Sequence, residues 1–338
     1  KTITMMFNTI TFFVLLCVSY SYGNSKGEEN FIDSEEYKKC FQMRNFFNLN
    51  DFDKLKRSIM NWNRMLPFYI RKEHLQQSQN SKEQEYLTNH RRFNMLGPVG
   101  PTCSKELETY GTGDEEKRAC GLKEIAEGAD GACIIFSIGS NNQWNFEEEI
   151  FDRTLCTVET FDCTVTDDVH PPERIQSRVN LHQICLGEND AVINNRTFMS
   201  WPSINKMIGL KTGPSFLKMD IEGYEFDVMK SIINSGTILP LQIAMEIHFI
   251  SIDFKKYLSS AELLTFMNFL RTFGGYYLVD RHDNDYCPHC SEILLAKLDC
   301  ANHPLNETEL VILEETQPQL FKYTSHTTHA HRKSPDSN

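Results

Sequence analysis

The sequence predicts an α/β fold built on a mostly parallel sheet. The main observation is residues 216–249, where two apolar runs enclose a helix-forming segment and carry acidic residues at their ends. Asp220 and Glu222 follow the first run, and Glu246 lies near the end of the second. A third apolar run, residues 132–138, ends at a glycine. Because parallel strands place their carboxyl ends on one edge of a sheet, we expect a ligand site there.

The other elements follow from the alternation of apolar and polar segments. We expect five strands before the end of the domain, at residues 133–138, 156–161, 179–186, 215–220 and 242–248. Helices are expected at residues 144–153, 225–235 and 260–273. Residues 275–280 and 292–298 close the domain as an antiparallel hairpin at the edge of the sheet.

Length and charge limit the class of protein. A chain of 338 residues with 40% hydrophobic content can bury a sizeable core. Its net charge of −12 is unfavourable for binding nucleic acid, because a phosphate backbone repels an acidic surface. The basic pairs Arg91-Arg92 and Arg332-Lys333 are too short to form a binding patch. We therefore expect no nucleic-acid partner.

The first residues resemble a targeting segment. Residues 9–18 are apolar and residues 19–24 are small or polar, and about ten apolar residues are fewer than the roughly 20 needed to cross a bilayer. We predict a signal peptide over residues 1–23, with a signal anchor in the ER or Golgi as the alternative. No later segment is apolar enough to span a membrane.

Cysteines and glycosylation sequons agree with the secretory pathway. Ten of the eleven cysteines follow the signal segment, and an even number in an oxidising compartment favours disulfides. Asn195 and Asn306 begin N-x-T sequons. We expect a secreted or lumenal protein.

Three regions follow the signal segment. Residues 24–96 form a polar helical accessory region, in which Phe52, Ile59 and Trp62 lie at helical spacing. Residues 97–316 form the main domain, and residues 317–338 form a polar, disordered tail.

Gly139 and Asp162 follow the first two strands of the main domain. Gly139 lets the backbone turn tightly against a ligand, and the amides of a helix starting near Gln143 would face it. An acidic residue about 20 residues later is placed to bind ribose hydroxyls. A turn with no ligand and a loop-capping aspartate are the alternatives. The turn lacks the three glycines of a dinucleotide fingerprint, so NAD or FAD is a poor fit.

These motifs resemble the class I S-adenosylmethionine-dependent methyltransferases, and among them the FkbM-like proteins and the animal methyltransferase-like proteins of the secretory pathway. The matching segments are Ser137–Asn141, Phe161-Asp162, Phe216–Glu225 and Met245–His248, within residues 97–300. The family's first turn often has an acidic residue and a second glycine, where this chain has Ser137 and Ser140-Asn141.

The resemblance implies a Rossmann-like sheet of seven strands with helices on both faces and an antiparallel last strand. It also implies that S-adenosyl-L-methionine binds to residues at the strand ends, namely Ser137, Gly139, Ser140, Asn141, Asp162, Asp220 and Glu222. Ser137 would contact the methionine ammonium group by a hydrogen bond.

Asp220, Glu246 and His248 are the candidate catalytic residues, with Glu246 or His248 as the base that deprotonates a hydroxyl. The expected reaction is O-methylation of a glycan or small molecule, and the alternative is a non-catalytic secreted protein that retains the fold. A turn at Glu222 that caps the next helix and a structural role for His248 are the alternatives at those positions. Carboxylates and an imidazole also suit Mg²⁺ or Mn²⁺, but the spacing is not a metal signature and we predict no metal site.

Two groups of cysteines are disulfide candidates. Cys103 and Cys120 bracket a short polar loop and are expected to bond to each other. Cys287 and Cys290 lie in the loop of the closing hairpin. We expect a bond within that loop or from it to Cys300, rather than a redox or zinc site.

Overall fold

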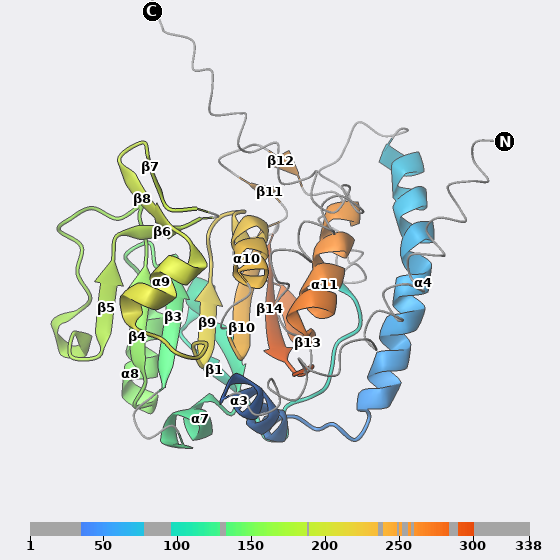
Figure 1. The fold of residues 1–338 in the computed structure, drawn as a ribbon, viewed down its shortest axis with the longest axis horizontal. Coiled ribbons are helices and arrows are strands. Elements are labelled where there is room, and N and C mark those ends of the chain that lie inside the picture. Colours follow the sequence, from blue (N-terminus) through green and yellow to red (C-terminus); the bar gives the residue numbers. More distant parts are fainter. Residues whose placement is uncertain are drawn as a thin grey trace, which may run out of the picture.

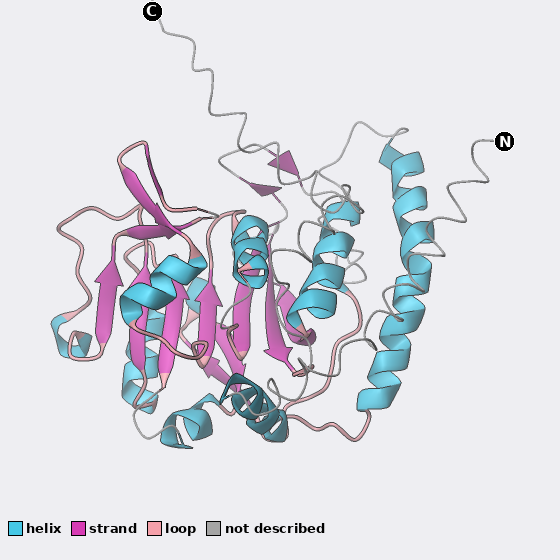
Figure 2. Ribbon diagram, in the orientation of Figure 1, coloured by secondary structure: helices cyan, strands magenta, loops and turns pink. Residues whose placement is uncertain are grey.

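The computed structural model shows a sheet between two layers of helices (Figures 1 and 2). It describes residues 35–77, 96–128, 133–187, 189–235, 239–248, 250–251, 256–257, 260–283 and 290–300. Several predictions fall outside these residues. They concern the signal segment at residues 1–23, the tail at residues 317–338, Cys287 and Asn306. In the described part of the chain, no helix is both long and apolar enough to cross a membrane.

The central sheet has seven strands, as the resemblance implied. Their order across the sheet is β13 (Tyr276–Asp283), β14 (Cys290–Lys297), β10 (Gln242–His248), β9 (Phe216–Met219), β3 (Ile134–Ile138), β4 (Thr157–Phe161) and β5 (Val179–His182). From β10 to β5 each neighbouring pair is parallel, whereas β14 is antiparallel to both β10 and β13. The reversed last strand is therefore confirmed.

Successive side chains of the central strands point to opposite faces of the sheet and pack into two hydrophobic cores, one on each face. Ile135 packs in one core and Phe136 in the other. The core that contains Phe136 is closed by α9 (Trp201–Ile208), α10 (Glu225–Asn234) and α11 (Ser260–Gly274). The opposite core is closed by α3 (Glu35–Met43), α7 (Leu122–Gly128) and α8 (Asn145–Arg153). Burial on both faces explains why the central strands read as continuous apolar runs.

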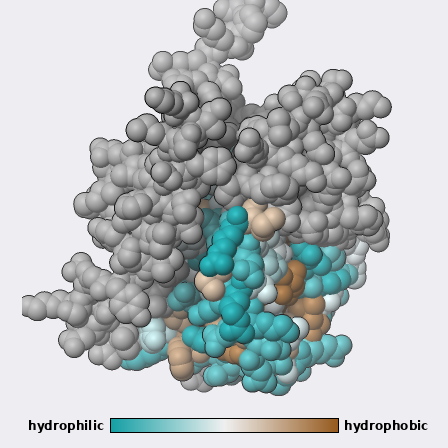
Figure 3. Space-filling view, turned by 90° about the vertical axis from the view of Figure 1, so that its right-hand side faces the viewer, coloured by the Kyte–Doolittle hydropathy of each residue, from teal (hydrophilic) through white to brown (hydrophobic). Residues whose placement is uncertain are grey.

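The accessory region packs against the main domain. Helix α4 (Phe52–Gln77) buries Phe52 and Ile59, as the helical spacing predicted, and a short 3₁₀ helix, η2 (Arg44–Phe46), precedes it. A disulfide between Cys40 and Cys300 joins α3 to the end of the sheet. Figure 3 faces the α4 side of the molecule, where the described surface is largely hydrophilic.

Smaller strands complete the fold. A hairpin of β1 (Leu107–Tyr110) and β2 (Lys117–Cys120) encloses the 3₁₀ helix η3 (Gly113–Glu115), and η4 (Glu173–Ile175) precedes β5. Strand β8 (Arg196–Met199) pairs with β6 (Ile184–Leu186) and β7 (Ala191–Ile193), and β11 (Ile250–Ser251) pairs with β12 (Lys256–Tyr257).

The predicted single strand at residues 179–186 is wrong. The chain leaves the central sheet after His182, and β6 joins the separate three-stranded sheet. A disulfide between Cys163 and Cys185 ties β6 to the loop that follows β4. This disulfide is not visible in the local sequence of residues 179–186, VNLHQICL.

The disulfides confirm one prediction and correct another. Cys103 is bonded to Cys120, as expected. Cys300 is bonded to Cys40, so the predicted bridge from the hairpin loop to Cys300 is wrong. The reason is that α3 packs beside the end of β14, which places Cys40 next to Cys300. Cys290 is also disulfide-bonded, and a further bridge joins Cys133 to Cys156.

Candidate functional site

A cleft of about 590 Å³ opens at the carboxyl ends of β3, β4, β9 and β10. It is lined by all but one of the residues predicted to bind cofactor, namely Gly139, Ser140, Asn141, Asp162, Asp220 and Glu222. The candidate catalytic residues Glu246 and His248 line it as well. Side chains from four strands therefore converge on one cavity of a size that suits a small molecule.

Ser137 is the exception. It lies inside β3 and is fully buried, and it is not part of the cleft wall. Among the described residues its Oγ atom has no hydrogen-bond partner. The contact of Ser137 with the cofactor therefore stays a prediction, and Ser137 is not among the residues that line the cleft.

The turn after β3 is fixed by close backbone packing. Gly139 has a φ of +80°, and a Cβ atom at this position would lie 1.7 Å from the carbonyl oxygen of Asp220. The Gly139 amide donates a hydrogen bond of 3.0 Å to the carbonyl of Phe161, and Lys218 Nζ donates to the Gly139 carbonyl. Glycine is thus required here by the adjoining strand ends.

Asp162 holds this turn against the loop that follows β4. One carboxylate oxygen accepts hydrogen bonds from the amides of Ser140 (3.0 Å) and Asn141 (2.7 Å). The other accepts from the amide (2.8 Å) and hydroxyl (2.6 Å) of Thr164. Burial would raise the pKa of Asp162, but these hydrogen bonds hold it below the usual range. The loop-capping alternative is what the geometry shows, and a ribose would share an acid already bound by four donors.

The start of helix α8 is occupied by another side chain. Glu115 Oε2 accepts a hydrogen bond of 3.0 Å from the amide of Asn145, the first residue of the helix. The expectation that the first amide of this helix faces a ligand is therefore wrong. Glu115 also lines the cleft, and its burial raises its pKa to about 7.

The other end of the cleft is densely charged. Ionisable side chains occupy one face of three neighbouring strands and their ends, namely Lys218, Asp220, Glu246, His248 and Glu292. Lys117 of β2 reaches this face, and its Nζ atom lies 2.5 Å from Glu292 Oε1 and 3.7 Å from Asp220 Oδ2. Burial opposes charge on Lys117, but these carboxylates raise its pKa well above the usual value. Lys117 is completely buried, so its ion pairs are shielded from solvent.

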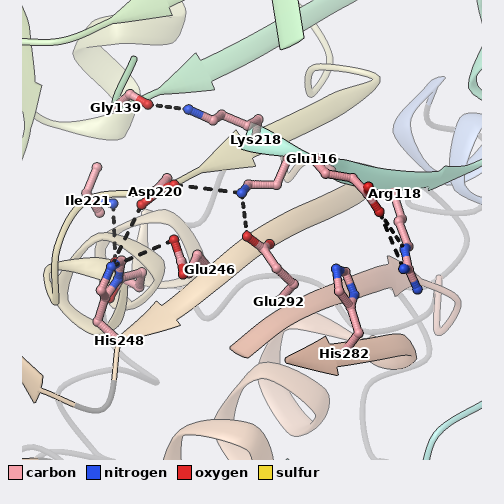
Figure 4. Close-up of polar contacts among 12 residues, drawn as sticks. Glu116, Arg118, Gly139, Lys218, Asp220, Ile221, Glu246, His248, His282 and Glu292 are labelled. Carbon is pink, nitrogen blue, oxygen red and sulfur yellow. Dashed lines mark hydrogen bonds and ion pairs between the residues drawn. The ribbon is translucent and has the colours of Figure 1, made fainter. Parts of the chain in front are cut away.

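His248 lies at the centre of the carboxylates, as Figure 4 shows for Asp220 and Glu246. Its Nδ1 atom is 2.8 Å from Glu225 Oε1. Its Nε2 atom is 3.5 Å from Glu222, 3.8 Å from Glu246 and 3.9 Å from Asp220.

The electrostatics of the two candidate bases differ. Burial would lower the pKa of His248, but the hydrogen bond to Glu225 and the surrounding carboxylates raise it to about 10. Burial and the charges of Asp220 and Glu292 raise the pKa of Glu246 to about 8. Burial also opposes ionisation of Asp220, but Lys117 and Lys218 keep its pKa below the usual range.

Sequence reasoning missed five charged residues of this site: Glu115, Lys117, Lys218, Glu225 and Glu292. The first two come from the β1–β2 hairpin, which lies about 100 residues before β9 and has no motif of its own. Glu225 lies in the segment that carries the resemblance, and Glu-x-x-Glu at residues 222–225 was a visible signal for its role.

Comparisons with known proteins agree on the type of domain. The model of a protein family described as a methyltransferase domain matches residues 48–297. Comparison with curated proteins finds no match.

Several solved structures are similar to parts of the chain. The FkbM methyltransferase of Methylobacillus flagellatus KT has 18% identity and a TM-score of 0.32, over 48% of this chain and 44% of that one. A putative O-methyltransferase from Klebsiella pneumoniae has 11% identity and a TM-score of 0.31, over 52% and 76%. Fibrillarin from Methanococcus jannaschii has 14% identity and a TM-score of 0.31, over 57% and 84%. The match thus spans less than half of the FkbM structure.

The family model covers well over half of the chain, and the seven-stranded sheet with its reversed last strand has the expected topology. The chain therefore belongs to this methyltransferase-domain family.

Proposed function

We propose that this chain transfers a methyl group from S-adenosylmethionine to a hydroxyl oxygen of a glycan or small molecule in the secretory pathway. The observation that carries the proposal is the convergence of the Gly139 turn, Asp220 and Glu246 on one cleft. Methyl transfer depends mainly on orientation, so one cavity that holds both reactants is the first requirement.

The residues present fit the cofactor. A cleft of about 590 Å³ is within the usual range for small-molecule sites. The Gly139 turn and the apolar Phe161 and Leu186 would hold the adenosine part, and Asp220 and Glu222 would face its positively charged part. When bound, the cofactor supplies an electrophilic methyl group on a sulfonium.

Glu246 is the better candidate for the general base. Its carboxylate lines the cleft and is therefore able to take the proton from an acceptor hydroxyl. His248 is less suited, because Nδ1 is bonded to Glu225 and Nε2 faces carboxylates that favour a retained proton. Its role in this proposal is to keep a positive charge beside Glu246.

The secretory setting is supported by the signal segment and the disulfides. Four cysteine pairs are bonded among the described residues, and such bonds persist in oxidising compartments. Asn195 is exposed at the turn between β7 and β8, where we propose that it is glycosylated. A mobility shift on treating the secreted protein with an N-glycosidase, lost in Asn195→Gln and Asn306→Gln together, tests this.

A non-catalytic protein that keeps the fold is the second candidate. The observation that favours it is Asp162, whose carboxylate is already bound by four protein donors.

Calorimetric titration of the full chain with S-adenosylmethionine and with its demethylated product separates the two. Saturable binding, followed by methyl transfer to a panel of glycans and small-molecule alcohols, is expected. Glu246→Gln should bind cofactor within about threefold of wild type but lose about 10²–10⁴ in turnover. The exposed Glu173→Gln is the matched control and should leave both unchanged. Absence of binding at millimolar cofactor would overturn the enzymatic proposal.

A further inference from the structure

The Nε2 side of His248 has the layout of a metal site. The side chain is only 6% exposed. Its Nδ1 atom is hydrogen-bonded to Glu225. Its Nε2 atom faces carboxylate oxygens of Glu222 and Asp220, which lie 3.5 and 3.9 Å away. Both separations are longer than an ordinary N–H···O hydrogen bond.

The separations match those of ligands that share one metal ion. Metal–nitrogen and metal–oxygen distances of about 2.0–2.2 Å place neighbouring ligand atoms about 3.0–3.5 Å apart and opposite ones about 4.2 Å apart. One ligand atom from each of Asp220, Glu222 and His248 lies within 4.8 Å of the others. The Glu222 side chain is 60% exposed, so small adjustments there face little resistance from packing.

Glu225 orients the imidazole as metal sites require. Its side chain is fully buried, and Oε1 accepts hydrogen bonds from the amides of Ile221 (3.2 Å) and Gly223 (3.1 Å). The same oxygen lies 2.8 Å from His248 Nδ1. A metal ion that displaces the Nε2 proton into solvent would bind the Nε2 lone pair between Asp220 and Glu222. The proton that remains on Nδ1 would stay hydrogen-bonded to Glu225, which is the carboxylate–histidine–metal arrangement.

The charge around His248 also favours a cation. Asp220, Glu222, Glu225, Glu246 and Glu292 lie in the cluster, and Lys117 is the lysine that forms ion pairs with it. A divalent cation between Asp220 and Glu222 would offset part of this negative charge. Cys290 lies beside Glu246 and His248, but its sulfur is in a disulfide and supplies no thiolate.

We propose that His248 Nε2 and the carboxylates of Asp220 and Glu222 bind a divalent first-row transition metal, with Glu225 as the positioning residue. One nitrogen and several carboxylate oxygens suit Mn²⁺ better than Ca²⁺, which takes oxygen ligands alone. The site lies in the proposed methyl-transfer cleft, but the proposal does not rest on that reaction.

Direct metal binding tests the site. The full-length chain is stripped with a chelator, dialysed, and titrated with Mn²⁺ without cofactor, and free Mn²⁺ is followed by electron paramagnetic resonance. We expect one saturable ion per chain, and displacement by Zn²⁺ but not by equal Ca²⁺. Affinity should fall at least tenfold in His248→Gln and Glu222→Gln, and about 10–100-fold in Glu225→Gln.

His182→Gln is the matched control. His182 Nε2 lies 2.7 Å from Glu159, so this variant removes a histidine–carboxylate pair that is outside the cleft wall. It should bind Mn²⁺ like wild type. Histidines in the tail, at positions 326, 329 and 331, are present in every variant and cancel in the comparison. Glu222→Gln changes an exposed side chain and keeps the test decisive where His248→Gln does not fold.

Two outcomes would overturn the metal site: no Mn²⁺ bound by the folded, stripped chain, or binding unchanged in both His248→Gln and Glu222→Gln. Titration of the same samples with S-adenosylmethionine reports separately on the proposed function. Metal binding without cofactor binding would retain this site and reject methyl transfer. Cofactor binding without metal binding would retain the proposed methyl transfer and reject the metal site.

Discussion

The two ends of the cleft are built in different ways. At the β3–β4 end, the turn is held by backbone contacts and by hydrogen bonds to Asp162, which accepts from four donors. At the β9–β10 end, Glu225 is hydrogen-bonded to His248 Nδ1, and the carboxylates of Glu222, Glu246 and Asp220 lie 3.5–3.9 Å from Nε2.

This difference indicates that the β3–β4 end fixes the shape of the cleft and that the β9–β10 end provides its reactive groups. Satisfied hydrogen bonds fix a turn in one conformation, which suits the binding of a rigid ligand group. Crowded and partly compensated charges shift proton affinities and attract cations, which suits chemistry. We therefore expect substitutions at the first end to act on folding and cofactor affinity, and most substitutions at the second to act through charge.

Gly139→Ala should have the largest effect. The added methyl would lie 1.7 Å from the Asp220 carbonyl, and the left-handed backbone alone costs roughly 1–2 kcal/mol. We expect loss of the folded protein or a fall of more than about 3 kcal/mol in the free energy of unfolding. Denaturant unfolding measures this.

Gly209→Ala is the control for Gly139. Its φ is +79°, nearly the same, but nothing lies within 4 Å of the added methyl. It should cost only the roughly 1–2 kcal/mol of the left-handed backbone. Equal losses at the two positions would show that close packing does not fix the first turn.

Lys117→Met comes next and tests the charged end. It leaves Glu292 and Asp220 without their buried partner, and breaking such a pair costs about 3–5 kcal/mol. Adding Glu292→Gln removes one of the stranded charges and should recover part of the loss. A double-mutant cycle by denaturant unfolding measures the recovery, and strictly additive losses would contradict charge pairing as the cause.

Asp162→Asn should have an intermediate effect. Asparagine keeps one acceptor oxygen, so one pair of donors from Ser140, Asn141 and Thr164 loses its partner, at about 1–3 kcal/mol. Cofactor affinity should fall as well, because the turn is no longer held. The exposed Asp168→Asn should stay within about 0.5 kcal/mol of wild type. Similar stability of the two variants would contradict the role of Asp162 in holding the turn after β3.

Glu115→Gln should have the smallest effect, visible as a pH dependence. The pKa of Glu115 is about 7 in the folded chain and 4.5 ordinarily, so the folded chain keeps a proton that the unfolded chain loses. Stability from that proton is complete below pH 4.5 and is lost as pH rises to 7.

Glutamine does not titrate, so the melting temperature of wild type should fall relative to Glu115→Gln across this interval. Thermal unfolding at a series of pH values measures the difference, and Glu149→Gln, at a partly exposed position, should follow wild type. Parallel curves for wild type and Glu115→Gln would contradict a raised pKa.

Much of the fold could be predicted because its signals are local. Buried parallel strands are apolar runs, and Gly139, Asp162 and Asp220 mark the points where three of them end. The helix at residues 225–235 and the closing hairpin were likewise visible in short windows. The strand at 179–186 failed because a disulfide from Cys163, far from that window, redirects its second half.

By itself the sequence determined the strands β3, β4, β9 and β10, the family, and the acidic residues at the strand ends, since each of these depends on neighbours along the chain. The tertiary structure alone decided that Lys117 lies beneath Asp220, that Glu225 orients His248, and that Cys40 bonds Cys300. These contacts join segments between 23 and 260 residues apart. Their energies depend on burial and on distances of a few ångströms, which no local pattern of residues contains.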